Sequence, residues 1–582
     1  MKVGLEVSSP ARSAGPVPGP DFRDDPFALE SRGWSCVSTE CQPKISALAS
    51  VANFAAPNPV AGVSYKSRGN LLVIAGSEPE LARRCAEEVA GALHVTLLGA
   101  SCLLPTVTAW SGRIESLDGY LGEFSVVIAG LEGAANPAAA KFDLVLDFSR
   151  PPLFAMRQPP QGYHHANGNE AETREILDEL RQSVGEFEKP RYFAYRENIC
   201  AHSRSQITGC SACIEICSTS AISADGDHVK VDPHLCMGCG ACATVCPSGA
   251  MSYQFPRVAD RGAQMKQLLS AYRQAGGRDA CIVFHDGVEG RELLGRSATA
   301  GVGLPARALP LVTWHIASIG LDLLLPAISY GASQVAVIAA GNDDRDYLDA
   351  LRGQMALGET ILHALGFGGT HFVLVEARTP EALERAFAAM PMGEVPATPA
   401  TFLLSDDKRT AIEFAVEHLV KQAPAKVEEI ALPEGSPWGE ILVDRNKCTM
   451  CMACVGACPE SALMDGVDKP LLKFLERNCV QCGLCEATCP EEAISLSPRL
   501  LLTPAVRETR VLNETQPFHC VRCQKAFGTR QVVEAMMGRL ASHSMFTGEG
   551  ALRRLQMCAD CRVVDMMSSK NEASVLRLGG EG

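Results

Sequence analysis

The residues with the clearest chemical potential are cysteines that repeat at fixed spacing. Two runs have the form C-x2-C-x2-C-x3-C-P, the first from Cys448 to Pro459 and the second from Cys479 to Pro490. This spacing is typical of loops that hold cubane iron–sulfur clusters, in which the fourth cysteine binds the neighbouring cluster. The alternative is a zinc site or a disulfide knot, but zinc sites normally use paired C-x-x-C units. The predicted ligand sets are Cys448, Cys451, Cys454 and Cys489, and Cys479, Cys482, Cys485 and Cys458.

A second pair of cysteine runs lies upstream, and one of its members is regular. It begins at Cys236 and ends at Cys246, followed by Pro247. Its first three cysteines should share a cluster with Cys217, the last cysteine of the preceding run. The predicted ligand set is Cys236, Cys239, Cys242 and Cys217.

The preceding run is irregular at both ends. Its first cysteine is expected at Ile207, but the nearest candidate is Cys200, seven residues upstream, and Ser218 replaces the usual proline. We expect the intervening residues to loop out, with Gly209 permitting the turn by a positive φ. The alternative is a three-cysteine cluster with an open position or a non-cysteine ligand such as His202. The predicted ligand set is Cys200, Cys210, Cys213 and Cys246.

Two further C-x-x-C pairs lie in the C-terminal tail. Four thiolates from two such pairs suit a tetrahedral zinc site of the zinc-ribbon kind. A rubredoxin-like iron or a cluster is the alternative. The predicted zinc ligands are Cys520, Cys523, Cys558 and Cys561.

Composition limits the possible roles of the 582-residue chain. Its 25 cysteines indicate metal binding in a reducing compartment, which favours the cytoplasm. The formal net charge of -14 argues against nucleic acid as a partner. We expect no signal peptide, because the first thirty residues lack an apolar core. We expect no membrane span, because the most apolar stretch, residues 309–330, contains His315 and Asp322.

The segments outside the cysteine runs predict α/β structure. Residues 70–150 and 279–395 alternate short apolar strands with helical stretches, which favours mostly parallel sheets. Gly76-Ser-Glu-Pro after the first strand lacks the G-x-G-x-x-G of a dinucleotide site. The sequence also shows no Ser/His/Asp constellation, P-loop or HEXXH motif, so we assign no catalytic residue.

The two double-cluster modules resemble bacterial polyferredoxins. The whole arrangement, including the Cys200-Ala-His-Ser insertion and the C-x-x-C tail, resembles the long ferredoxin-type proteins associated with bacterial molybdenum formate dehydrogenases. The stretch from Leu323 to Ile338 is similar to the delta subunit of methyl-viologen-reducing hydrogenases. These resemblances imply a redox partner of the formate dehydrogenase or hydrogenase type and a docking role for the middle domain.

The expected fold class is multidomain α/β plus α+β. It comprises two bacterial-type dicluster ferredoxin modules, two α/β (Rossmann-like) domains and a zinc-ribbon-like tail. The predicted segments are a loosely ordered arm (1–65), an α/β domain (66–190), the first dicluster module (191–256), a hydrogenase-delta-like α/β domain (257–400), a helix and linker (401–440), the second dicluster module (441–500) and the zinc-ribbon-like tail (501–582).

Three functions are compatible with these features. The first is a non-catalytic electron-transfer subunit that carries four [4Fe-4S] clusters within a cytoplasmic oxidoreductase complex. The second is an accessory, maturation or redox-sensing scaffold for such an enzyme. The third is an oxidoreductase subunit with its own flavin, which the missing glycine fingerprint disfavours.

Overall fold

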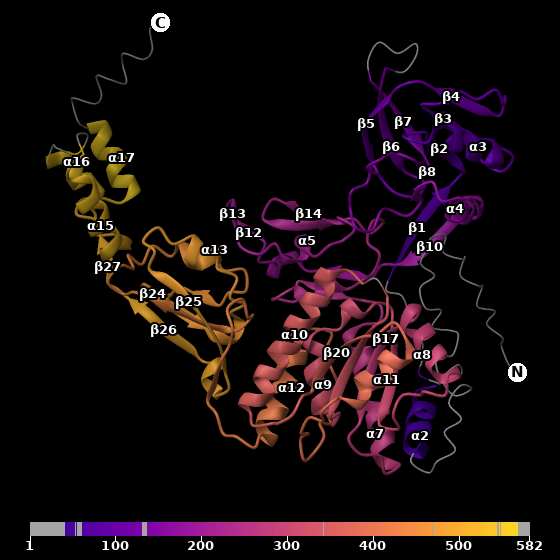
Figure 1. Ribbon diagram of the computed structural model, residues 1–582. Coiled ribbons are helices and arrows are strands. Elements are labelled where there is room, and N and C mark those ends of the chain that lie inside the picture. Colours follow the sequence, from indigo (N-terminus) through magenta and orange to yellow (C-terminus); the bar gives the residue numbers. More distant parts are fainter. Residues whose placement is uncertain are drawn as a thin grey trace, which may run out of the picture. The chain divides into compact units, whose positions relative to one another are not determined.

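The structure is a computed structural model that describes residues 41–52, 54, 61–130, 137–341, 343–467, 469–543, 546 and 549–568. These residues fall into two compact units. The first comprises Met1–Arg196, Ala212–Asp225 and Val229–Ala425, and the second comprises Glu197–Ser211, Gly226–His228 and Lys426–Gly582. Figure 1 shows the elements of both.

The first unit begins with a helix and a five-stranded parallel sheet. Part of the segment expected to lack order, Gln42–Val51, forms helix α2, because Ala47 and Val51 are buried where it packs on α7. The sheet has the order β4-β3-β2-β8-β9, and α3 and α4 contribute to the core on one face. Its elements are β2 (Asn70–Ile74), α3 (Pro79–Val89), β3 (His94–Leu98), β4 (Val107–Trp110), β8 (Leu144–Asp147), β9 (Tyr163–His165) and α4 (Glu170–Gln182).

Antiparallel strands complete this region. A three-stranded meander packs on the other face of the sheet, and a two-stranded ribbon leads into the first cysteine run. These strands are β1 (Gly62–Ser67), paired with β10 (Gly185–Pro190), and β5 (Arg113–Asp118), β6 (Phe124–Ala129) and β7 (Ala138–Phe142).

The middle of the chain forms a four-stranded parallel sheet in the order β18-β17-β19-β20. Every residue of β18 and β19 is buried, as expected where helices cover both faces of a parallel sheet. Residues 309–330 are a buried strand, a short 3-10 helix and a helix, as predicted. The elements are α7 (Val258–Gln274), β17 (Cys281–Asp286), α8 (Glu289–Thr299), β18 (Ala308–Thr313), η3 (Ile316–Ser318), α9 (Leu321–Ser329), β19 (Gln334–Ala339), α10 (Arg345–Ala364), β20 (Phe372–Glu376), α11 (Pro380–Ala388) and α12 (Lys408–Gln422).

The first pair of cysteine runs lies on short elements between these two sheets in the sequence. They are β11 (Phe193–Tyr195), η2 (Glu197–Ile199), β12 (Ser203–Arg204), β13 (Ile207–Thr208), α5 (Ala212–Glu215), β14 (Ile222–Asp225), β15 (His228–Val231), α6 (Ala241–Val245) and β16 (Met251–Tyr253). Strand β11 pairs with β16, so the two ends of this region are held together.

The second pair of cysteine runs lies in the second unit, between short antiparallel strands. Arg499 binds both oxygens of the buried Glu476 carboxylate at 2.8 Å, and Arg499 and Arg510 both contact Glu440, at 2.9 and 2.7 Å. Among these, the Arg499–Glu476 pair is the most buried, and removal of one partner from a buried ion pair typically costs about 3–5 kcal/mol. The elements are β21 (Glu429–Ala431), β22 (Gly439–Val443), α13 (Ala453–Ala457), β23 (Leu463–Met464), β24 (Leu471–Leu475), η4 (Glu476–Asn478), α14 (Leu484–Ala487), β25 (Ile494–Leu501), η5 (Pro504–Arg507) and β26 (Thr509–Glu514).

The C-terminal tail is a hairpin followed by helices. Its elements are β27 (Pro517–His519), β28 (Ala526–Thr529), α15 (Arg530–Leu540), α16 (Glu549–Leu555) and α17 (Ala559–Ser568). The few buried side chains of this tail centre on Cys520, Met557 and Cys558. Such a small apolar core gives little stability by itself, so the tail depends on another source of stability.

Candidate cluster and metal sites

The cysteine loops of the regular runs share one backbone conformation. In each loop, the residues directly before and after the second cysteine have positive φ. They are Gly238 and Gly240, Met450 and Met452, and Gln481 and Gly483, with φ between 52° and 80°. A non-glycine residue in this conformation costs of order 1 kcal/mol, so the loop needs a compensating interaction. Backbone amides turned toward cluster sulfur atoms would supply it.

In the second pair of cysteine runs, from Cys448 to Cys489, one predicted ligand set lines a single pocket. The side chains of Cys458, Cys479, Cys482 and Cys485 line one pocket with Ile441, Phe474, Leu484 and Leu496. Burial and then the neighbouring thiols raise the pKa of Cys482 to about 11. Four thiolates therefore do not persist there alone, whereas coordination by a metal cluster deprotonates thiols. The residues fit an iron–sulfur cluster.

The other predicted ligand set of these two runs, Cys448, Cys451, Cys454 and Cys489, also lies close together. The pKa of Cys454 is raised to about 12 by burial and then by Cys448, Cys451 and Cys489. Cys489, the last cysteine of the second run, thus lies near the cysteines of the first run. The last thiol of each run also accepts a hydrogen bond from a backbone amide. The Ala462 amide donates to Cys458 at 3.2 Å, and the Ala493 amide donates to Cys489 at 3.4 Å.

In the first cysteine pair, the set that includes Cys217 gathers within the first unit. Burial raises the pKa of Cys236 to about 12, with Cys239 and Cys217 adding to the shift. Burial also raises the pKa of Cys242, and the neighbouring thiols of Cys239, Cys236 and Cys217, and then of Cys213, add to the shift. All four predicted ligands are therefore close together.

Side chains from distant segments of the first unit hold this loop. Lys189 donates to the carbonyls of His234 and Cys236 at 2.8 and 2.7 Å. Lys408 donates to the carbonyls of Ala243, Thr244 and Cys246 at 2.6–3.0 Å, at the C-terminal end of α6. Neither lysine could be predicted from the sequence, because neither lies near a recognisable motif.

The remaining predicted set is divided between the two units, so its assembly around one cluster stays a prediction. Cys213 and Cys246 belong to the first unit, and Cys200 and Cys210 belong to the second. Cys200 and Cys246 are buried. The alternative ligand His202 is also buried, and its Nδ1 lies 2.8 Å from the Cys210 carbonyl oxygen, which occupies that ring nitrogen.

The insertion after Cys200 forms a small hairpin, β12–β13, whose turn differs from the expectation. Ser205 and Gln206 adopt positive φ, at 52° and 70°, the form that matches strand twist in two-residue turns. Gly209 has no positive φ; it is needed for close packing. A Cβ there would lie 2.6 Å from Leu484 Cγ and 2.7 Å from the Ala201 carbonyl oxygen. The end of the hairpin therefore packs on α14, whose Cys485 belongs to a ligand set of the second pair.

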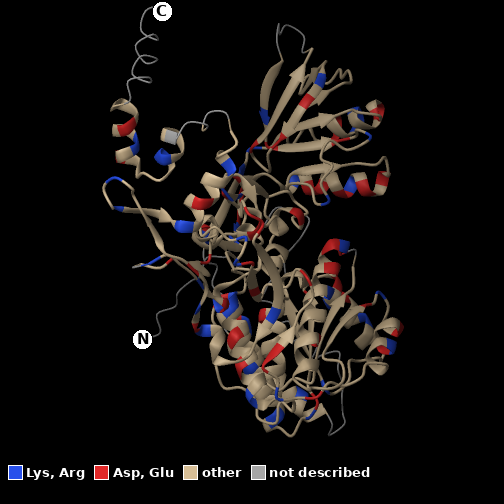
Figure 2. Cartoon of the chain, turned by 90° about the vertical axis from the view of Figure 1, so that its left-hand side faces the viewer, with Lys and Arg blue, Asp and Glu red and all other residues tan. Residues whose placement is uncertain are grey.

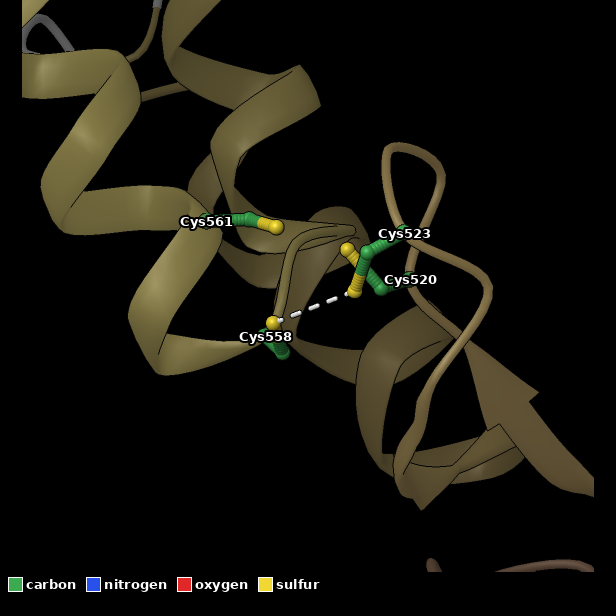
Figure 3. A group of neighbouring side chains, drawn as sticks. All are labelled: Cys520, Cys523, Cys558 and Cys561. Carbon is green, nitrogen blue, oxygen red and sulfur yellow. Dashed lines mark hydrogen bonds between the residues drawn. The ribbon is translucent and has the colours of Figure 1, made fainter.

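The four tail cysteines converge on one point. Their sulfur atoms all lie within 4.8 Å of one another (Figure 3). Cys520 and Cys523 come from the β27–β28 turn, whereas Cys558 and Cys561 lie at the start of α17, so the second pair is on a helix and not on a second hairpin. Although desolvation opposes ionisation, backbone amides of Cys523, Cys558 and Arg522 lower the pKa of Cys520 to about 6. An ionised thiolate among three others fits a tetrahedral metal site.

A second group of possible metal ligands, Glu359, His363 and His371, does not resemble a metal site. His371 is buried, and its two ring nitrogens contact Glu359 Oε2 at 2.9 Å and the Glu394 carbonyl at 3.0 Å. Both nitrogens are already occupied, so this group ties α10 to β20.

The cysteines outside these sets have other surroundings. Cys85 and Cys281 are buried in the cores of the two parallel sheets, and Cys102 packs against the first of these cores. Cys41 is disulfide-bonded, whereas Cys36 lies outside the described residues.

Comparison with known families agrees with the two cysteine pairs. Models described as a 4Fe-4S dicluster domain match residues 208–250 and 440–490. The chain has two 4Fe-4S dicluster ferredoxin domains. It is polyferredoxin-like, and iron–sulfur domains of this kind indicate electron transfer. The first match begins after Cys200, so the displaced cysteine lies outside the matched residues. No curated protein matches the chain.

Among the described residues, every helix is too short or too polar to cross a bilayer.

Proposed function

We propose that this polyferredoxin-like chain relays single electrons through four [4Fe-4S] clusters within an oxidoreductase complex. The observation that carries the proposal is the crossed gathering of thiols. Cys458 joins the three leading cysteines of the next run, and Cys217 joins those that follow it. Crossed ligation holds two clusters side by side, which suits electron relay and requires no substrate pocket.

A contact in the second unit supports passage between the two modules. The charge of Cys210 acts on the pKa of Cys482, and α14 packs on the hairpin that ends at Gly209. In our assignment these thiols bind different clusters, one from each module. The electron path would therefore cross from the first module to the second beside Cys210 and Cys482.

The partner, the tail metal and the location are parts of the same proposal. The sequence resemblance favours a formate dehydrogenase-like or hydrogenase-like enzyme as the redox partner. Four converging thiols favour zinc in the tail, as a structural ion. The thiols need a reducing compartment, which favours the cytoplasm. We assign no catalytic residue to the chain, and the surrounding enzyme would perform the chemistry.

Metal and electron counts test the proposal. The anaerobically purified full chain should contain about sixteen iron and sixteen sulfide ions and accept about four electrons. These are measured by metal analysis and by reductive titration followed by electron paramagnetic resonance (EPR). About eight iron ions with those sites fully occupied would remove one module from the proposal. A flavin spectrum would instead favour a flavin-containing subunit.

The assignment of Cys200 has its own test. Cys200→Ala should lose one cluster or convert it to a three-iron form, while the set containing Cys217 keeps its EPR signal. Cys102→Ala is the matched control, because Cys102 lies outside the ligand sets and should leave the iron content unchanged. If Cys200→Ala keeps four complete clusters with unaltered potentials, Cys200 is not a ligand.

A further inference from the structure

Gln481 stands between the first two cysteines of the run from Cys479 to Cys489. The other regular runs have Gly238 and Met450 at the same place, and neither residue has a polar side chain. The three residues share a positive φ, so the three loops have the same backbone form at this point. A side chain that can donate hydrogen bonds therefore distinguishes this loop from the other two.

The side-chain amide of Gln481 donates two hydrogen bonds. Its Nε2 lies 3.0 Å from the Glu440 carbonyl oxygen and 3.3 Å from Cys479 Sγ. Because a backbone carbonyl only accepts, the nitrogen of the amide, and not its oxygen, must face Glu440. Nε2 carries two hydrogen atoms, so one bonds Glu440 and the other is available to the sulfur. The contact with β22 thus fixes the direction of the bond to Cys479.

The amide is held in this place at a cost in stability. A Cβ at Gly439 would lie 2.7 Å from Gln481 Cδ, so the glycine makes room for the amide. The Oε1 atom of Gln481 is buried and has no hydrogen-bond partner among the described residues. A buried acceptor without a partner destabilises the fold. This arrangement favours a role for the amide beyond packing.

The two predicted ligand sets of the second pair of runs differ in this donor and in exposure. Each set accepts one backbone amide bond, at Cys458 and at Cys489. Within the described part of the chain, no side chain donates to a thiol of the set that contains Cys451. Cys451 is exposed, whereas Cys479 is 8% exposed. Burial makes a cluster harder to reduce, because the added negative charge is less well solvated.

We infer that Gln481 is a positioning residue that raises the reduction potential of the cluster held by Cys458, Cys479, Cys482 and Cys485. This inference rests on the proposed function. A hydrogen bond to a ligand sulfur stabilises the reduced cluster more than the oxidised one, because the reduced cluster carries more negative charge. The amide therefore offsets part of the effect of burial. An electron that passes between the exposed and the buried cluster then meets a smaller difference in energy.

The test compares midpoint potentials of the full chain under anaerobic conditions. Gln481→Met removes both N–H donors and introduces the residue of the preceding run, where Met450 has a similar φ of 58°. One reduction step should move to a lower potential, with an equilibrium constant for reduction about three- to tenfold smaller. The other steps and the iron content should be unchanged. In EPR-detected proton resonance, one exchangeable proton coupled to that cluster should disappear.

Gln274→Met is the control. Gln274 is exposed at the end of α7 and its amide bonds the Ser270 hydroxyl, so all potentials should be unchanged. Complete clusters with unshifted potentials and the same exchangeable proton in Gln481→Met would overturn the inference and leave the proposed function standing. Absence of clusters from the unmodified chain would instead overturn the proposed function.

A second variant decides if Gln481→Met does not assemble its cluster. Gln481→Glu keeps the shape of the side chain, but a carboxylate has no N–H to donate and adds negative charge. Both changes disfavour the reduced state, so the same step should move to a lower potential. An unshifted step in Gln481→Glu would refute the role of Gln481.

Discussion

Buried cationic side chains next to the cysteine loops show how single residues prepare an electron-transfer site. Lys189 and Lys408 come from different segments, yet each places an ammonium group on carbonyls beside predicted ligands. A cluster bound by four thiolates is negatively charged, and reduction adds to that charge. A nearby ammonium group therefore favours the reduced state of whichever cluster it faces.

Lowering the pH should reduce the free energy of unfolding of the N-terminal α/β region, because His164 is buried there. Burial lowers the pKa of this residue to about 4, below the ordinary value near 6.5. Between these values the unfolded chain binds more protons, so the free energy of unfolding falls as the pH is lowered through this window and is fully retained above it. The loss should reach about 3 kcal/mol.

The matched pair for this prediction is His164→Gln and His94→Gln. His94 is exposed in β3 of the same sheet. Hydrogen exchange of the sheet amides at pH values between about 4 and 7 measures the effect. Only His164→Gln should flatten the pH dependence; equal slopes in both variants would contradict the role of His164.

At the scale of the elements, the tail depends on a hairpin and a helix whose four thiols converge on one point. Cys523→Ser should abolish zinc binding and leave the iron content unchanged. Amide protection across residues 517–568 should fall by orders of magnitude, since structural zinc sites contribute about 10 kcal/mol or more. Zinc analysis of the full chain and hydrogen exchange measure this. Iron in place of zinc in natively produced protein would reject the zinc assignment.

The elements also show what the sequence could and could not predict. Strands β17 to β20 were predictable because parallel strands are continuous apolar runs. The short antiparallel strands β5 and β7 were not, because most of their residues are exposed or half-buried and give no clear apolar signal. The cluster ligands were predicted from spacing alone. By contrast, Lys189 and Lys408 reach the loop from Cys236 to Cys246 only through the tertiary fold.

In the N-terminal sheet the direction of winding reverses between β2 and β8. Open parallel sheets commonly bind ligands beyond the carboxyl ends of their strands at such a reversal. There the loop after β2 contacts the loop after β8 directly. Ser77 donates to the Phe148 carbonyl, and a Cβ at Gly76 would lie 2.5 Å from the Phe148 backbone. This close packing agrees with the absence of a glycine fingerprint and supports a structural role for this sheet.

For the molecule as a whole, charge should govern how electrons arrive. The formal net charge is -14, and Figure 2 shows acidic and basic residues interspersed along the helices. Reduction by the methyl viologen radical cation should slow about tenfold as salt rises from about 0.01 to 0.5 M, because screening weakens the attraction. Reduction by an anionic donor should become faster. Stopped-flow absorbance measures both rates, and parallel salt dependence for the two donors would contradict electrostatic steering.

The loop from Cys236 to Cys246 is covered by two side chains that follow it in the sequence, Tyr347 on α10 and Lys408 on α12. The loop is therefore synthesised before the residues that cover it. Its last thiol, Cys246, precedes Tyr347 by roughly a hundred residues and Lys408 by more. At about 5–20 residues per second, the ribosome needs about 5–20 s to make that interval. During this time the thiols are present while the side chains that enclose them do not yet exist. A cluster can therefore be inserted into this loop while translation continues. In a chain that completes folding without iron, the thiols are already enclosed.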